Sequence, residues 1–167
     1  MKKLKNSELN RISIEEFKNS SKTPIKVLLD NIRSAHNVGS IFRSCDAFLV
    51  DEIILCGITA KPPNKEIRKT ALGSTDSVKW SYFENIKDVI LKLKQEKYQI
   101  ISVEQADKST NLKEFKIQSK KKYAIIFGNE INGVDQKVID MSDDVVEIPQ
   151  FGTKHSFNVS VLSLIHI

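Results

Sequence analysis

A stretch near the carboxyl end of the chain joins a strand end, a turn and a helix start, with small polar side chains between them. The extended run Val145–Ile148 stops at Pro149, which lacks an N–H and would not extend a sheet interior. A turn with Gly152 follows, and Ser156 and Asn158 are both good helix N-caps for the apolar run after them. In open α/β sheets, such loops bind ligands through backbone donors and small polar groups. Spacing alone is a weak predictor, because many strand–loop–helix junctions bind nothing.

The overall composition is that of a globular domain with a basic surface. The chain has 167 residues and a mass of 19.0 kDa, which suits one domain with its own core. Its formal charge of +5 and pI near 9.1 favour an anionic partner such as RNA. An organism whose proteins are generally rich in lysine would produce the same excess of positive charge. No apolar run approaches the length that spans a bilayer, and no apolar signal region follows the lysine-rich N-terminus. We therefore expect a cytoplasmic protein without a membrane partner.

Side chains that commonly bind metals are few and scattered. Cys45 and Cys56 lie in apolar runs without metal-ligand spacing, and we interpret both as reduced core residues. The three histidines do not complete a metal site either. We expect no bound metal.

Strands that alternate with helices must position these residues. The expected strands are 26–30, 52–56, 78–82, 98–103, 123–127 and 145–148, and the expected helices are 37–48, 65–72, 85–97, 111–115, 135–141 and a last one after 158. Asn37 is the expected N-cap of the first of these helices. This order predicts an α/β fold, a mostly parallel sheet with helices on both faces. Connection rules argue against a knot as the default.

Three sequence blocks carry a family resemblance. Residues 30–43 read DNIRSAHNVGSIFR, residues 125–134 read IIFGNEINGV, and residues 148–160 read IPQFGTKHSFNVS. In this order and spacing, the blocks resemble the SpoU (TrmH-like) family of RNA 2′-O-methyltransferases, in the SPOUT superfamily. The resemblance covers roughly residue 26 to the C-terminus.

The resemblance implies a SPOUT α/β knot, a trefoil formed by roughly the segment from Tyr123 onward, and a homodimer with its active site near the interface. It divides the chain into a basic N-terminal extension, residues 1–22, and a SPOUT methyltransferase domain, residues 23–167. Family members run a long helix after the third block, whereas this sequence ends at Ile167. We therefore expect a short C-terminal helix of about 15 Å.

The resemblance also implies S-adenosyl-L-methionine as cofactor. Gly128, Ile148 and Phe157 match cofactor-contact positions, and Phe157 stands where most members have leucine. Gly128 directly follows a strand and would let a ligand approach the backbone closely. Ile148 and Phe157 would supply apolar walls for adenine, and Pro149 would stiffen the turn. Glu104, in the loop after an earlier strand, is a further cofactor-binding candidate.

The implied catalytic residues are Arg43, Asn37, Glu130, Ser156 and Asn158. The family arginine that matches Arg43 is assigned the activation of a ribose 2′-hydroxyl, often with help from an RNA phosphate. Because a guanidinium stays protonated, we expect Arg43 to fix the phosphate and polarise the hydroxyl. Asn37 would position Arg43 or the ribose, and Glu130 would orient Asn37 or Arg43 rather than take the proton itself. Ser156 and Asn158 would hold the loop and the acceptor, although helix capping alone would also explain them.

The basic residues expected to contact the RNA backbone are Arg33, Lys65, Arg68, Lys69 and Lys154; an ordinary solvated surface is the alternative for each. The expected function is methylation of a ribose 2′-hydroxyl in RNA, with tRNA favoured because the chain is compact and has no obvious appended RNA-binding domain. The alternatives are an rRNA methyltransferase and a catalytically silent RNA-binding protein of the same fold. A Rossmann-type oxidoreductase ranks low, since no G-x-G-x-x-G follows the first strand.

Overall fold

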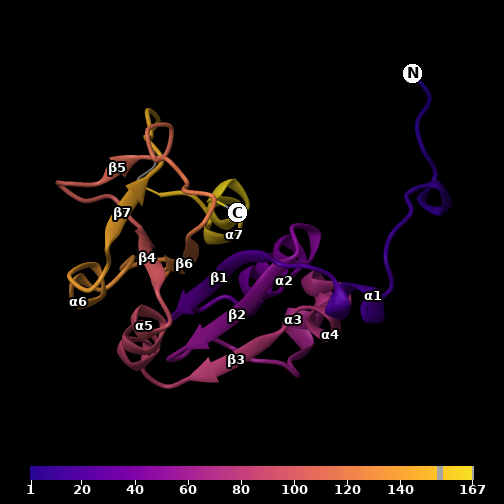
Figure 1. The fold of residues 1–167 in the computed structure, drawn as a ribbon, viewed down its shortest axis with the longest axis horizontal. Helices are drawn as coiled ribbons and strands as arrows, with labels where there is room; N and C mark the ends of the chain where they lie inside the picture. Colours follow the sequence, from indigo (N-terminus) through magenta and orange to yellow (C-terminus); the bar gives the residue numbers. More distant parts are fainter. Residues whose placement is uncertain (154–155, 167) are drawn as a thin grey trace.

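A parallel sheet of seven strands forms the centre of the molecule in the computed structural model, which describes residues 1–153 and 156–166 (Figure 1). The strands are β1 (Thr23–Asp30), β2 (Val50–Cys56), β3 (Trp80–Phe83), β4 (Tyr98–Val103), β5 (Thr110–Asn111), β6 (Lys122–Phe127) and β7 (Asp144–Glu147). Their order across the sheet is β3-β2-β1-β6-β4-β7-β5, and every pairing between them is parallel. The predicted α/β fold is therefore confirmed.

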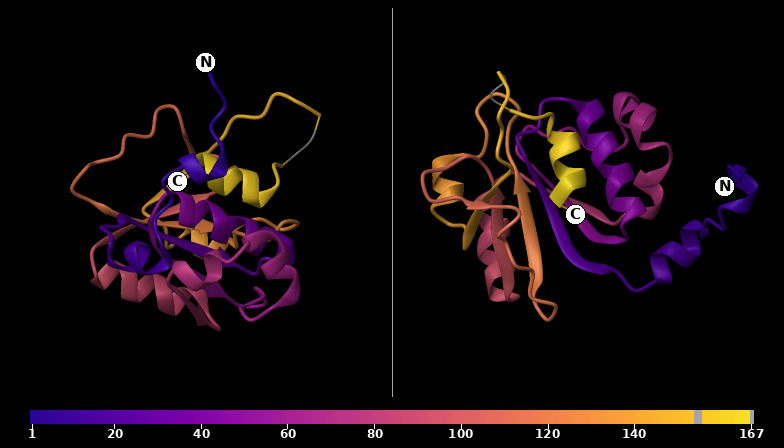
Figure 2. Two further views of the ribbon diagram at one scale, coloured as in Figure 1. Left: turned by 90° about the vertical axis from the view of Figure 1, so that its right-hand side faces the viewer. Right: turned by 90° about the horizontal axis from the view of Figure 1, so that it is seen from above.

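Helices cover both faces of this sheet (Figure 2). The α-helices are α1 (Ile14–Asn19), α2 (Ala35–Ala47), α3 (Lys65–Ala71), α4 (Ser74–Ser77), α5 (Ile86–Gln95), α6 (Gln136–Ile139) and α7 (Val159–His166). The 3₁₀ turn η1 (Asn6–Glu8) lies in the N-terminal segment, away from the sheet (Figure 1). One core contains side chains of α1, α2, α3 and α7, and the other contains those of α5 and α6. No helix in the described part of the chain has the length and apolar character needed to cross a bilayer.

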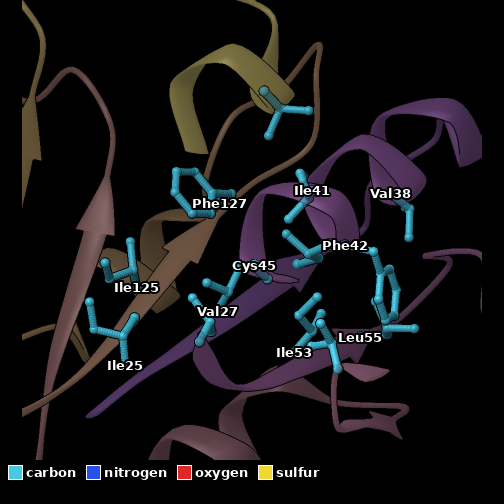
Figure 3. Packing of buried hydrophobic residues seen from close by; sticks show 14 of the residues in the cluster. Ile25, Val27, Val38, Ile41, Phe42, Cys45, Ile53, Leu55, Ile125 and Phe127 are labelled. Carbon is cyan, nitrogen blue, oxygen red and sulfur yellow. The ribbon is translucent and has the colours of Figure 1, made fainter. Parts of the chain in front are cut away.

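The central strands are apolar on both sides because both sides are covered. Val27 and Leu29 of β1 belong to the core under α2, while Leu28 between them belongs to the core under α5. Figure 3 shows the first core, in which Phe42 of α2 lies over the strands. Both cysteines are buried and free, as the sequence predicted, and burial raises the pKa of Cys56 to about 12.

The start of α2 differs from the sequence-based expectation. The helix begins at Ala35, and Ser34 is its N-cap, with its hydroxyl accepting a hydrogen bond from the N–H of Asn37 at 3.3 Å. Asn37 was expected to cap the helix, but it lies inside the first turn. Its side chain is instead engaged by Glu130 and Asn158. The prediction of the cap was therefore wrong by three residues, because these contacts come from distant segments.

The expected helix over residues 111–115 is also wrong. Thr110 and Asn111 form the short edge strand β5, which pairs with β7. The side-chain oxygen of Asn111 then accepts a hydrogen bond from the N–H of Lys113 at 3.0 Å, which makes a turn of the kind that asparagine favours. The N–H of Leu112 donates to the carbonyl of Glu147 at 2.9 Å. Pairing with β7 and this local turn compete successfully with helix formation.

Helix α3 packs closely against α2 at Gly39, which yields a stability prediction. A Cβ atom there would lie 2.2 Å from Oγ1 of Thr70 and 2.3 Å from the carbonyl oxygen of Ile67. Because one of these atoms is backbone, Gly39→Ala should lower the free energy of unfolding by about 1–3 kcal/mol. Gly152→Ala, where nothing lies within 4 Å, is the matched control and should change it by less than about 0.5 kcal/mol. Urea unfolding measures both, and equal stabilities would contradict the packing account.

Candidate active site

A cavity of about 280 Å³ opens at the carboxyl ends of β4, β6 and β7. It is lined by Val103, Glu104, Gln105, Phe127, Gly128, Asn129, Glu130, Ile131, Asn132, Gly133, Glu147, Ile148, Gln150, Ser156, Phe157, Val159 and Leu162. Strands β2 and β3 extend the sheet on one side of β1, and β6 and β4 extend it on the other. The cavity therefore lies near the place where the strand order reverses, which is where open α/β sheets bind ligands.

Four of the five predicted cofactor-binding residues line this cavity. Gly128 and Ile148 follow β6 and β7, Glu104 follows β4, and Phe157 comes from the loop before α7. Pro149 is half-buried and lies between two lining residues without lining the cavity itself. Its role as a stiffener of the turn stays a prediction.

Gly128 is required by a close approach of the chain to itself. A Cβ atom at Gly128 would lie 2.3 Å from the carbonyl of Gly133 and 2.4 Å from the nitrogen of Val134. The loop folds back because Asn129 and Gly133 exchange two backbone hydrogen bonds, of 3.0 and 2.8 Å. A glycine at position 128 thus serves the shape of the cavity wall, whichever ligand the cavity binds.

Glu104 fixes the same wall from the other side. Its Oε2 accepts a hydrogen bond from the N–H of Val134 at 2.8 Å, and its Oε1 accepts one from the N–H of Gln105 at 2.8 Å. Oε2 would also lie 2.0 Å from a Cβ atom at Gly133, whose φ is +67°. Both carboxylate oxygens are therefore used by the backbone. Glu104 shapes the cavity, and its direct contact with a cofactor stays a prediction.

Three predicted catalytic residues, one from each sequence block, form a continuous hydrogen-bonded chain. Glu130 accepts hydrogen bonds from the backbone N–H groups of Arg33 at 2.8 Å and Ser34 at 3.0 Å. It also accepts one from the side-chain amide of Asn37 at 3.0 Å. The side-chain oxygen of Asn37 accepts from the amide of Asn158 at 3.1 Å. These residues line a second hollow, which adjoins the cavity because Glu130 lines both.

Asn158 and one further predicted catalytic residue, Ser156, take part in the start of α7 and in the cavity wall, respectively. Asn158 accepts a hydrogen bond from the N–H of Ser160 at 2.8 Å and so caps α7 while it also contacts α2. Ser156 lines the cavity and is exposed. Capping and site formation are therefore combined in Asn158 rather than being alternatives.

The electrostatics of Glu130 indicate an orienting role. Partial burial raises the pKa of this carboxyl, but the N–H of Arg33, the amide of Asn37 and the N–H of Ser34 outweigh it, so the pKa is lowered below its ordinary value of 4.5. A carboxyl whose pKa is lowered is a weaker base than an unperturbed one. Its hydrogen bonds instead fix the loop between β1 and α2.

Arg43 does not line the cavity. It is exposed on α2 and lines a separate hollow together with Ser40, Ser44, Lys69 and Thr70. Among the residues whose side chains are described, none forms a hydrogen bond or ion pair with its guanidinium. Arg43 follows Asn37 by six residues, which is about 9 Å along the helix and roughly 240° around it. The two predicted catalytic residues of α2 therefore face different directions.

The predicted RNA-contacting residues fall in two places. Lys65, Arg68 and Lys69 are exposed on α3, where Lys69 pairs with Glu66 at 2.8 Å and shares the hollow of Arg43. Arg33 is exposed in the loop after β1, beside the hollow that contains Asn37. Lys154 lies outside the described residues.

Sequence reasoning missed two asparagines that join the loops of the site. Asn129 donates from its side chain to the carbonyl of Asn31 at 2.8 Å. Both residues lie within the recognised blocks, and Asn129 is directly between Gly128 and Glu130. The Asn132–Gly133 pair, a turn signal, indicates a tight loop here, but not the residue that secures it.

The fold and the cavity define an α/β protein with a pocket at the carboxyl edge of a parallel sheet. Residues 24–167 match the SpoU rRNA Methylase family, and the chain belongs to this family. The match confirms the resemblance found in the sequence.

Named relatives agree with this assignment. The chain is 31% identical to a tRNA (guanosine(18)-2′-O)-methyltransferase of Aquifex aeolicus over 81% of its own length and 63% of the relative. The crystal structure of the A. aeolicus TrmH/SpoU tRNA modifying enzyme superimposes with a TM-score of 0.78 at 27% identity, covering 91% of this chain and 75% of that one. An AdoMet-bound rRNA methyltransferase from Sinorhizobium meliloti shares the fold, with a TM-score of 0.80, 24% identity and coverage of 89% and 57%. The chain thus spans less than two thirds of two of these three relatives.

The lowered pKa of Glu130 predicts how acid affects stability. A carboxyl with a lowered folded-state pKa stabilises the fold above its unfolded value of 4.5, and this stabilisation is lost as the pH falls through the folded-state pKa. Glu130→Gln, which cannot titrate, should therefore lose less stability than the wild type between about pH 7 and about pH 3. Urea unfolding at the two pH values measures the difference. Glu114→Gln, at an exposed position, is the control and should lose as much stability as the wild type. Equal acid sensitivity of all three proteins would contradict a contribution of the Glu130 hydrogen bonds to stability.

Proposed function

We propose that the chain methylates a ribose 2′-hydroxyl in RNA, with S-adenosyl-L-methionine as the methyl donor. The observation that carries the proposal is the chain of hydrogen bonds Glu130–Asn37–Asn158 beside the cavity, in a member of the SpoU family. A tRNA substrate is favoured over rRNA because the Aquifex relative is named as a tRNA methyltransferase and the related crystal structure as a tRNA modifying enzyme. We also place the protein in the cytoplasm, where such RNA is available.

The cavity fits the proposed cofactor. Phe127, Ile148 and Val103 give it apolar walls, while the loop after β6 contributes backbone polar groups, as an adenine pocket requires. Gly128, Ile148 and Phe157 would hold the cofactor, which supplies an electrophilic methyl group when bound. The Sinorhizobium structure, which is named as AdoMet-bound, indicates that this fold accommodates the molecule. Glu104 and Gly128 keep the wall in place.

The chain's own residues would handle the acceptor. Asn37 and Asn158 present amide groups at the hollow beside the cavity, where a ribose can be held. Arg43 would bind the adjacent phosphate and polarise the 2′-hydroxyl. Because Arg43 opens away from the cavity of its own chain, we assign this action to Arg43 of the partner subunit in a homodimer.

Exposed apolar side chains around the site support the homodimer. Phe151 is 96% exposed, Ile131 is 71% exposed and Val161 of α7 is 49% exposed. They come from three segments that border the cavity, the loops after β6 and β7 and the helix α7. Apolar groups gathered at one edge are typical of a contact surface.

The knot and the domain boundaries are part of the same proposal. Strand β6 enters the sheet between β1 and β4, which precede it, and β7 enters between β4 and β5. Helix α7 then returns to α2, where Asn158 and Asn37 are hydrogen-bonded across 121 positions of sequence. This course supports a trefoil in the segment from Tyr123 onward. Residues 23–167 would form the methyltransferase domain, and residues 1–22 a basic extension that docks through the buried Phe17.

The proposal predicts that Arg43→Ala lowers methyl transfer roughly 100- to 1000-fold, because the phosphate and the hydroxyl lose their cationic partner. Transfer of labelled methyl groups from S-adenosyl-L-methionine into total RNA measures the rate. Calorimetry with the cofactor should give nearly the wild-type affinity, since Arg43 does not line the cavity. Wild-type turnover by the variant would remove Arg43 from the mechanism. A wild-type chain that binds RNA without methylating it would favour the catalytically silent alternative.

A second prediction concerns RNA affinity. Lys65→Ala combined with Arg68→Ala should weaken RNA binding and reduce the salt slope by roughly 0.7–0.9 for each phosphate that the variant no longer neutralises. Filter binding of tRNA across a salt series measures both quantities. Lys92→Ala combined with Lys137→Ala removes the same charge from α5 and α6 on the other face of the sheet and is the control. Equal slopes for the two double variants would show that α3 does not contact RNA.

A further inference from the structure

Asn129 lies where the two loops of the site meet. Its side-chain nitrogen donates a hydrogen bond to the carbonyl of Asn31 at 2.8 Å. Its side-chain oxygen accepts hydrogen bonds from the N–H groups of Ile131 at 2.9 Å and Asn132 at 3.1 Å. Its backbone makes the paired hydrogen bonds with Gly133. One half-buried side chain therefore fixes its own loop and joins that loop to the segment after β1.

The segment after β1 is itself held tightly around Asn31. This residue has a φ of +56°, a conformation that asparagine tolerates better than most residues. Its side-chain oxygen accepts from the N–H of Ile58 at 3.2 Å, and its side-chain nitrogen donates to Asp30 at 3.0 Å. Because the side chain of Asn31 is held by these two hydrogen bonds, its backbone carbonyl is a well-defined acceptor for Asn129.

Asn129 and its neighbour Glu130 both form hydrogen bonds with the segment after β1, Asn129 as a donor and Glu130 as an acceptor. Asn129 donates to the carbonyl of Asn31, whereas Glu130 accepts from the N–H groups of Arg33 and Ser34. Gly128, the residue before them, lines the cavity. Three consecutive residues thus connect the cavity wall to the loop from which α2 begins.

We propose that Asn129 is a positioning residue that couples the cofactor cavity to the acceptor-binding amides of Asn37 and Asn158. The inference rests on the function proposed above. Displacement of the segment after β1 would shift the start of α2, and with it Asn37, relative to the cavity. Misplacement of reacting groups by about 1 Å can cost about 100-fold in rate. The proposed role is one of geometry and is separate from the part of the cavity wall that Asn129 also forms.

Asn129→Asp tests the inference because it keeps the size of the side chain and an oxygen for Ile131 and Asn132. It removes the donor and places a carboxylate oxygen against the carbonyl of Asn31. We expect kcat for methyl transfer to fall about 10- to 100-fold, a larger change than that in the dissociation constant of S-adenosyl-L-methionine. Asn85→Asp is the matched control, since Asn85 caps α5 with its oxygen alone, accepting from Lys87 at 3.0 Å.

A double-mutant cycle separates positioning from general destabilisation. If Asn129 acts through Asn37, then Asn129→Asp should reduce kcat much less in an Asn37→Ala background than in the wild type. If the loss of kcat in the double variant equals the product of the losses in the two single variants, the inference is overturned. So would a kcat for Asn129→Asp equal to that of the Asn85→Asp control.

Hydrogen exchange supplies a readout that does not depend on activity. The backbone amides of Arg33 and Ser34 should exchange faster in Asn129→Asp than in the wild type and in Asn85→Asp. Unchanged protection of these amides would contradict the coupling even if turnover fell. A wild-type chain without methyl transfer would instead contradict the proposed function, and the exchange experiment would still decide whether the two loops are coupled.

Discussion

The carboxylate of Glu130 is the contact on which the geometry of the site depends. It accepts hydrogen bonds from two backbone N–H groups of the segment after β1 and from the side-chain amide of Asn37 in the first turn of α2. The N–H groups of a helix start have no partners within the helix, and a carboxylate stabilises them through hydrogen bonds and charge. The third hydrogen bond fixes the orientation of Asn37, which leaves its oxygen directed to Asn158. One anion thus organises three segments that are far apart in the sequence.

Close backbone packing limits which residues can surround this anion. Gly128 faces the backbone of residues 133 and 134, and Gly133 faces the carboxylate of Glu104, so neither position has room for a methyl group. The loop is consequently held by backbone hydrogen bonds and short polar side chains rather than by apolar contacts. Such a loop can be rigid at a surface where little apolar area is buried. Rigidity is what a cavity needs if its ligand is to meet a second substrate in one orientation.

Much of the fold and many of the site residues could be predicted from the sequence, but the contacts between the loops of the site could not. Strands such as 98–103 and the helix of Ile86, Val89, Ile90 and Leu93 were evident because burial on both sheet faces leaves a strong apolar pattern. Strand β5 was missed because its two residues pair only with a strand 36 positions later. The contacts of Asn37 and the clamp by Asn129 were missed for a similar reason. Both are made with distant segments, which leave no periodic signal in the local sequence, whereas the cap by Ser34 is a local hydrogen bond.

The direction of α2 constrains how the proposed reaction can be assembled. The first turn of this helix faces the site of its own chain, because Asn37 forms hydrogen bonds with Glu130 and Asn158. A residue six positions later points to the far side of the same helix, and a rigid helix cannot turn both side chains to one place. Arg43 accordingly shares its hollow with Lys69 of α3, on a surface that carries positive charge suited to phosphate. In the proposed homodimer a second α2 would complete the site, so dimer formation would control catalysis by supplying a guanidinium rather than by changing the cavity.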